Sequence, residues 1–272
     1  MLWYEQEIEM KYYVADAFTD ELFKGNPAGI CILEKWLDNV LLQNIAYENN
    51  LAETAFIVKN NSQYELRWFT PKTEIELCGH ATLASAYIIK NFIEDNDFLT
   101  FNTKSGILTV LYNKENELYE MDFPAIKTKK VEIIETVQNA INEKIKETYL
   151  SRDLLLLLEN EEQVKNLKVK FDLLKTLNIC HGFIATALSS NKEYNFVSRY
   201  FAPNLGINED HVTGSSHSTL IPFWAERLGK NELIAKQLSK RGGTLYCKNN
   251  GDRVKISGKV KLYLEGNIKI NI

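Results

Sequence analysis

The sequence predicts a strand-rich α+β fold of two similar halves, each with one buried helix. Three observations predict this fold. The segment 81–92 is nearly all apolar, and a helix that is apolar on every side lies inside the protein. A second apolar segment follows at 220–225. Each is preceded by an Arg-aromatic-Phe-x-Pro motif and a glycine-containing turn, which indicates a repeat.

Composition excludes several classes of protein. A chain of 272 residues with 45% hydrophobic and 25% charged residues is typical of a globular protein with a large core. The formal net charge of -4, with no basic run longer than 127–130, argues against a nucleic-acid partner. The longest strongly apolar run, 154–158, is too short to cross a membrane, and the first residues are acidic, unlike a signal peptide. We therefore expect a cytoplasmic protein.

Cysteine spacing gives no framework for disulfides or metal binding. Cys31, Cys78, Cys180 and Cys247 are far apart in the chain, so we expect reduced thiols. No CxxC pair is present, and the sequence predicts no metal site.

The first half is predicted from alternation, turn residues and helical spacing. Residues 1–10 carry no interpretable pattern. The expected helix at 41–47 has Asp38 placed to cap it. The expected strands are 12–18, 30–33, 55–58 and 65–69 before the central helix, then 98–101, 106–112 and 118–123 after it.

A boundary is expected at Pro124. It separates an N-terminal half, 1–124, joined by the C-terminal strand near 262–272, from a C-terminal half, 125–261. Pro222 is expected to kink the second buried helix or move its start later. The second half is predicted to hold helices at 131–145 and 171–177 and strands at 154–158, 183–187, 196–201, 245–247, 254–257 and 260–264.

The two turns predict an anion site. Free backbone N–H groups in the first turn of a buried helix, with the helix dipole behind them, bind a carboxylate or an enolate. We expect the N–H groups of Gly79 and His80, and of Gly214 and Ser215, to hold the substrate's carboxylate and the developing enolate charge.

Four side chains are candidate acid/base groups, each with a plainer alternative. Glu53 lies among apolar residues, where burial suits a carboxylate to proton transfer, or it is a strand-end Glu that reaches solvent. His80 starts the first buried helix, whose positive end favours a neutral imidazole, or it merely caps that helix. Asp210 is a second catalytic carboxylate, a loop acid or a cap, and Ser215 caps the second helix, donates to the substrate, or both.

These residues resemble the PhzF-like phenazine-biosynthesis isomerase family. The motifs occur in the family's order and spacing over nearly the whole chain. They are Phe18-Thr19, Gly25–Gly29, Asn50–Phe56, Arg67–Pro71, Leu77–Thr82, Glu209-Asp210, Thr213–Ser215 and Arg241–Gly243. The resemblance implies a diaminopimelate-epimerase-like fold of two pseudo-symmetric halves, in each of which a sheet wraps around the central buried helix. It further implies an active site between the two halves, chemistry without a cofactor, and a homodimer. It also implies that Glu53 is the catalytic acid/base and that His80 is catalytic.

The function expected from both arguments is a cofactor-independent isomerase that moves a proton within a small carboxylate-bearing metabolite. A two-cysteine racemase mechanism is incomplete, because Thr213 stands where the second thiol would be. Ala52 and His211 depart from the phenazine enzyme and leave the substrate open. The alternatives are a non-catalytic metabolite-binding or interaction module on the same fold and a racemase or epimerase.

Overall fold

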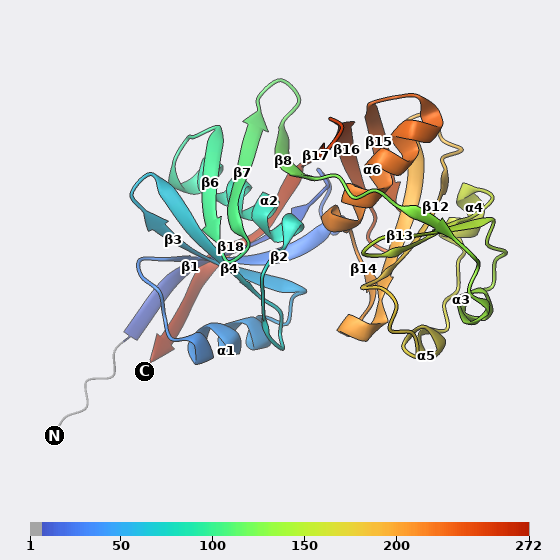
Figure 1. The fold of residues 1–272 in the computed structure, drawn as a ribbon. Coiled ribbons are helices and arrows are strands. Elements are labelled where there is room, and N and C mark those ends of the chain that lie inside the picture. The colour runs from blue at the N-terminus through green and yellow to red at the C-terminus, as the bar shows by residue number, and fades with distance from the viewer. Residues whose placement is uncertain (1–6, 272) are drawn as a thin grey trace. The chain divides into compact units, whose positions relative to one another are not determined.

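The computed structural model describes residues 7–271, which form two compact units (Figure 1). The first unit contains the residues up to Phe23, Pro27–Met121 and the stretch from Lys259 onward. The second contains Lys24–Asn26 and Asp122–Gly258. Within the described part of the chain, no helix is long and apolar enough to cross a membrane.

The first unit is built on a mostly antiparallel sheet. Its strands are β1 (Glu7–Ala17), β2 (Asn26–Leu33), β3 (Glu53–Asn60), β4 (Gln63–Phe69), β5 (Glu74–Ile75), β6 (Phe98–Thr103), β7 (Gly106–Asn113), β8 (Leu118–Pro124) and β18 (Val260–Asn271). They are paired in the order β18, β1, β2, β3, β4, β6, β7, β8, and β5 also pairs with β4. The β2–β3 and β4–β6 pairs are parallel. All seven strands predicted for this half are confirmed.

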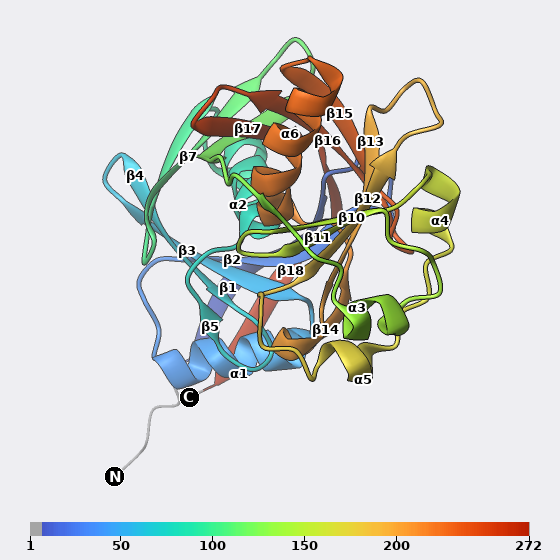
Figure 2. The ribbon, with the colours of Figure 1, turned by 45° about the vertical axis from the view of Figure 1, so that its right-hand side comes forward.

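Helix α2 (Gly79–Ile88) is the buried helix of this unit, and a π-helical turn, Ile89–Ile93, follows it. Residues 80–86 are all buried, and α2 packs against β1, β3 and β18, as both ribbon views show (Figures 1 and 2). The hydroxyl of Ser85, a polar group inside this helix, donates to the carbonyl of Ala81 at 2.7 Å. The prediction of a helix buried on every side is therefore confirmed.

Helix α1 (Asn39–Asn49) begins as predicted. The Asp38 carboxylate accepts a hydrogen bond from the backbone N–H of Val40 at 2.8 Å, and Asn50 ends the helix in the left-handed conformation.

The second unit repeats the same strand scheme. Its strands are β9 (Lys129–Val131), β10 (Glu147–Leu150), β11 (Leu154–Leu157), β12 (Phe183–Leu188), β13 (Phe196–Ala202), β14 (Ile207–Asp210), β15 (Glu232–Gln237), β16 (Gly243–Asn249) and β17 (Arg253–Gly258). Pairing follows β9, β10, β11, β12, β13, β15, β16, β17, with β14 beside β13. The parallel pairs β11–β12 and β13–β15 match β2–β3 and β4–β6 of the first unit. The predicted internal repeat is therefore present in the topology.

Helix α6 (Gly214–Leu228) corresponds to α2 and packs against β15, β16 and β17. Pro222 lies inside it, so the prediction that this proline moves the start of the helix later is wrong. Proline has no N–H to donate to the carbonyl four residues earlier, which belongs to Ser218. That carbonyl instead accepts a hydrogen bond from the N–H of Ile126 at 2.9 Å.

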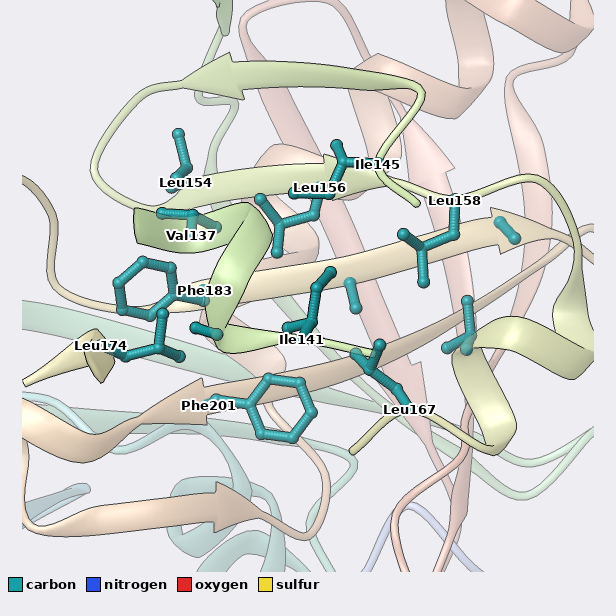
Figure 3. Close-up of a cluster of buried hydrophobic side chains, with 14 of the residues drawn as sticks. Val137, Ile141, Ile145, Leu154, Leu156, Leu158, Leu167, Leu174, Phe183 and Phe201 are labelled. Atoms are coloured by element: carbon teal, nitrogen blue, oxygen red, sulfur yellow. The ribbon is translucent and has the colours of Figure 1, made fainter. Parts of the chain in front are cut away.

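Three short helices of the second unit pack against a core cluster that also contains residues of β11, β12 and β13. They are α3 (Glu135–Ala140), α4 (Glu161–Lys165) and α5 (Phe171–Leu174). A 3-10 turn, Pro203–Leu205, follows β13. The cluster in Figure 3 brings side chains of these helices and their loops together with those of β11, β12 and β13. Its labelled members are Val137, Ile141, Ile145, Leu154, Leu156, Leu158, Leu167, Leu174, Phe183 and Phe201.

The prediction of a helix over 131–145 is wrong in extent. Only Glu135–Ala140 is helical, while Val131 ends a strand and Ile141 forms an isolated bridge with Val169. The apolar residues of this stretch are spaced as in a helix because they all pack into one core. Only part of the segment that carries them is helical, and the rest is irregular. The predicted helix 171–177 ends early, at Leu174.

Candidate functional site

Helix α2 starts without a side-chain cap. Its N-cap residue, Cys78, has an extended backbone and makes no capping hydrogen bond through its side chain to any residue of the described chain. Gly79 is the first helical residue and His80 the second, so the alternative in which His80 caps the helix is wrong. The first-turn N–H groups therefore keep the anion-binding character expected of an uncapped helix N-terminus.

Glu53 is buried beside His80. It is the first residue of β3, and the residue is only 7% exposed, so it does not reach solvent as the plainer alternative supposed. Its Oε2 lies 3.1 Å from Nε2 of His80, which is also buried. The contact is close but lacks the alignment of a hydrogen bond, and Oε2 has no hydrogen-bond partner among the described residues.

Cys78 completes this group of side chains. Its Sγ lies 3.5 Å from Nδ1 and 4.0 Å from Nε2 of His80. Burial raises the pKa of the Cys78 thiol, and the charge of Glu53 adds to that effect. A thiol, an imidazole and a carboxylate thus meet at the start of the buried helix.

The expectation of a neutral His80 is not supported. Burial acts to lower the pKa of His80, but electrostatic interactions with Cys78 and Glu53 outweigh burial and hold the pKa well above its usual value. The effect expected of the helix N-terminus does not decide the pKa of His80, because interactions with Cys78 and Glu53 raise it. Local position on the helix was therefore a poor guide to the charge of this imidazole.

Asp210 is held by its own unit. It ends β14, and its Oδ1 accepts a hydrogen bond from the amide of Asn26 at 2.8 Å. Its Oδ2 accepts from the hydroxyl of Thr213 at 2.6 Å. The side chain of Gln237 bridges the same loop, donating to the Asp210 carbonyl and accepting from the N–H of Thr213, at 2.9 Å each. These bonds fix the orientation of the carboxylate.

Helix α6 also begins without a side-chain cap. Thr213 is its N-cap residue, and the side chain of Thr213 makes no capping bond within residues 7–271, so the prediction that Ser215 is the N-cap residue is wrong. Gly214 is the first helical residue, and Ser215 lies in the first turn. The hydroxyl of Ser215 accepts a hydrogen bond from Nη2 of Arg152 at 3.1 Å.

Arg152 and Asp153 belong to this network and were not predicted. Arg152 Nη2 lies 2.8 Å from the Asp153 carboxylate, which is fully buried and also accepts from the hydroxyl of Tyr200 at 3.0 Å. The only signal in the sequence is an Arg-Asp pair directly before the apolar run 154–158. A charged pair at that place is compatible with an ordinary surface turn, so sequence reasoning had no means to single it out.

The register of the repeat shows which residue replaces Glu53 in the second unit. Thr54 is opposite Phe69, and Phe183 is opposite Phe201 in the matching pair of strands. The residue before Phe183 is Gly182, which therefore occupies the position of Glu53. A carboxylate at this position is specific to the first unit.

The chain has close relatives along nearly its whole length. Residues 15–266 match the family described as phenazine biosynthesis-like protein. A relative from Pseudomonas aeruginosa, named an uncharacterized isomerase, is 44% identical over 264 residues, which cover 97% of this chain and 100% of the relative. A relative from Halalkalibacterium halodurans, also named an uncharacterized isomerase, is 44% identical over 94% of this chain and 97% of its own.

Solved structures agree with the fold. A PhzF-family phenazine biosynthesis protein from Enterococcus faecalis has a TM-score of 0.93 at 46% identity, covering 96% of this chain and 99% of its own. A hydroxyproline epimerase from Agrobacterium vitis has a TM-score of 0.64 at 9% identity, covering 100% and 95%, and shows the fold alone. The predicted epimerase-like fold is thereby confirmed. The chain belongs to the phenazine biosynthesis-like PhzC-PhzF family and is an enzyme of the isomerase class.

Proposed function

We propose that the protein is a cofactor-independent isomerase that moves a proton between two carbons of a small, unsaturated or cyclic carboxylate. The observation that carries the proposal is the buried Glu53 carboxylate 3.1 Å from the imidazole of His80, at the uncapped start of α2. A carboxylate kept from water beside a second proton carrier is suited to general acid/base catalysis.

The reaction needs no redox partner. Glu53 removes a proton from a carbon next to the unsaturated system, and the electron pair of that C–H bond moves into the conjugated carboxylate. The N–H groups of Gly79 and His80 stabilise the resulting enolate. Glu53, assisted by His80, returns the proton to a different carbon, so substrate and product differ only in the position of one hydrogen and one double bond.

In the second unit, Asp210 and Ser215 are proposed to assist the reaction, and Gly214 to bind the substrate. Hydrogen bonds from Asn26 and Thr213 hold the Asp210 carboxylate in one orientation, as a positioned acid/base group requires. The homodimer and the cytoplasmic location remain predictions.

A two-base racemase is a weaker description of this chain. Racemization by two thiols needs a cysteine at the second turn, and Thr213 occupies that position. Its hydroxyl donates to Asp210 at 2.6 Å, and an alcohol is a far weaker base than a thiolate. The second turn therefore lacks the group that such a mechanism uses.

Glu53→Gln tests the proposal. The protein is incubated in deuterated water with a panel of small unsaturated carboxylates, and deuterium incorporation is followed by mass spectrometry. Gln keeps the size of the side chain but cannot take a proton, so incorporation should fall by about a hundredfold to ten-thousandfold. Substrate binding should be retained, because the N–H groups are unchanged.

Glu48→Gln is the matched control, since it makes the same change on an exposed face of α1. Its exchange rate should equal that of the wild type. Asp210→Asn should also lose exchange. Full exchange by Glu53→Gln on a substrate turned over by the wild type would overturn the assignment, whereas binding without exchange in both proteins would indicate a binding module.

A further inference from the structure

The three side chains at the start of α2 have the composition of a zinc site. Glu53, Cys78 and His80 each offer one ligand atom, and these atoms all lie within 4.8 Å of one another. All three residues are buried. Carboxylate oxygen, thiolate sulfur and imidazole nitrogen are the three donor types that Zn²⁺ prefers in proteins.

Two of the three ligand separations are close to those of a tetrahedral centre. Zinc bonds of about 2.0–2.3 Å place neighbouring ligand atoms roughly 3.3–3.6 Å apart. Nε2 of His80 lies 3.1 Å from Oε2 of Glu53 and 4.0 Å from Sγ of Cys78. Shifts of about half an ångström would bring both separations into that range, and side-chain rotation alone provides shifts of this size.

The oxygen atom of Glu53 gives independent support. Oε2 is buried and has no hydrogen-bond partner among residues 7–271, although His80 Nε2 is near. A buried oxygen without a partner is costly unless something else satisfies it. A cation bound by the carboxylate would satisfy this oxygen.

Charge balance also favours a divalent ion. One thiolate and one carboxylate cancel the two charges of Zn²⁺, and the imidazole binds as a neutral ligand. A buried group of zero net charge avoids the large penalty of an isolated interior charge. Three protein ligands leave one position open, as in zinc sites that exchange a small ligand.

We propose that Glu53, Cys78 and His80 bind Zn²⁺ reversibly and that the bound ion inhibits the enzyme. The inhibition rests on the proposed function, since zinc would occupy the two groups that move the proton. The binding does not rest on it. This inference departs from the sequence-based expectation of no metal. Glu53 belongs to strand β3, whereas Cys78 and His80 lie at the start of helix α2, so their approach is a feature of the tertiary structure.

Cobalt titration tests the binding directly. Co²⁺ takes similar ligands to Zn²⁺ and, when bound to a thiolate, gives a charge-transfer band in the near ultraviolet together with visible bands of four-coordinate cobalt. The full-length protein, stripped of metal, should bind one Co²⁺ per chain with both sets of bands. Added Zn²⁺ should abolish them by displacement.

Three variants separate this site from adventitious binding. Cys78→Ser should lose the charge-transfer band, and Glu53→Gln should weaken cobalt binding by about tenfold or more. Cys180→Ser, which changes the partly exposed thiol of the second unit, should keep the wild-type spectrum. Melting curves show whether each variant is folded, and Glu53→Gln keeps the test valid if Cys78→Ser does not fold.

A wild-type protein without a thiolate band would overturn the proposal. A spectrum unchanged by Cys78→Ser, or one lost in Cys180→Ser, would do the same. Cobalt bands in a protein that shows no exchange on any substrate would uphold the metal site while removing the proposed isomerase. Exchange that is insensitive to Zn²⁺ in a protein lacking cobalt bands would remove the metal site alone.

Discussion

The backbone N–H of Ile126 donates a hydrogen bond of 2.9 Å to the carbonyl of Ser218, inside helix α6. Pro222 leaves that carbonyl without its usual intrahelical donor. Ile126, in the segment that follows β8, thus supplies the hydrogen-bond donor that the helix itself lacks at this carbonyl. This bond explains how a buried helix tolerates an internal proline.

Replacing this donor should destabilise the protein. Ile126→Pro removes the N–H and leaves the Ser218 carbonyl unsatisfied, which should lower the free energy of unfolding by about 1–3 kcal/mol. Denaturant titration measures the change. In a Pro222→Ala background the helix supplies its own donor, so the same substitution should cost less. Equal losses in the two backgrounds would show that the Ile126 bond does not compensate for Pro222.

A methyl group at Gly182 should disrupt the start of β12. A Cβ built at Gly182 would lie 2.3 Å from the hydroxyl oxygen of Tyr200 and 2.4 Å from Cζ. Gly182→Ala should therefore destabilise the protein by about 1–3 kcal/mol, seen as a lower melting temperature. Gly266→Ala is the matched control, because its nearest neighbour would be 3.9 Å away. Similar melting temperatures for both variants would contradict this account.

Arg199 should not tolerate lysine. Its Nε and Nη2 bond both carboxylate oxygens of Glu209 at 2.7 and 2.9 Å, and its Nη1 donates to the carbonyl of Leu167 at 2.8 Å. Lysine has no planar fork with which to repeat this pattern. Arg199→Lys should lower the free energy of unfolding by about 1–3 kcal/mol, because a partly buried carbonyl also loses its donor.

Arg67 provides the control in the other unit. It forms the same two bonds to Glu74, at 2.7 and 2.9 Å, but its further contact is to the exposed side chain of Asn39. Water can replace a lost bond at Asn39, so Arg67→Lys should cost less than Arg199→Lys. The reverse order in denaturant titrations would reject the argument.

His217 should make stability depend on pH. It is fully buried in α6, and burial lowers its pKa to about 4. Since the folded pKa lies below the ordinary value of 6.5, the unfolded chain binds more protons between pH 6.5 and 4. Stability should be complete above pH 6.5 and fall by about 3 kcal/mol on acidification to pH 4.

Comparison with His217→Asn isolates this contribution. Asn does not titrate, and its amide is placed to replace the 2.8 Å hydrogen bond between Nδ1 and the carbonyl of Thr213. The difference in unfolding free energy between the two proteins should shift by about 3 kcal/mol between pH 7 and pH 4, with the wild type losing more. A difference independent of pH would show that His217 is not held neutral.

The sequence by itself determined the elements whose information is local. The apolar run after Gly79 specified a buried helix, because every face of it is hydrophobic. Alternation and turn residues specified most strands, and Asp38 marked the start of α1. The repeated motif specified two similar units. Sequence patterns missed the short strands β5, β9, β10 and β14 and the helix α4, which contain too few residues for a periodic pattern. The six-residue strand β15 was also missed, although its residues alternate between buried and at least partly exposed positions in the structure.

The tertiary structure decided the environment of the site residues. Burial of Glu53, its distance from His80 and its share in raising the pKa of that imidazole depend on contacts between segments far apart in the chain. The hydrogen bond from Asn26 that holds Asp210 depends on folding in the same way. A residue's sequence neighbours set its local conformation, whereas its charge state is set by whichever groups folding brings within a few ångströms.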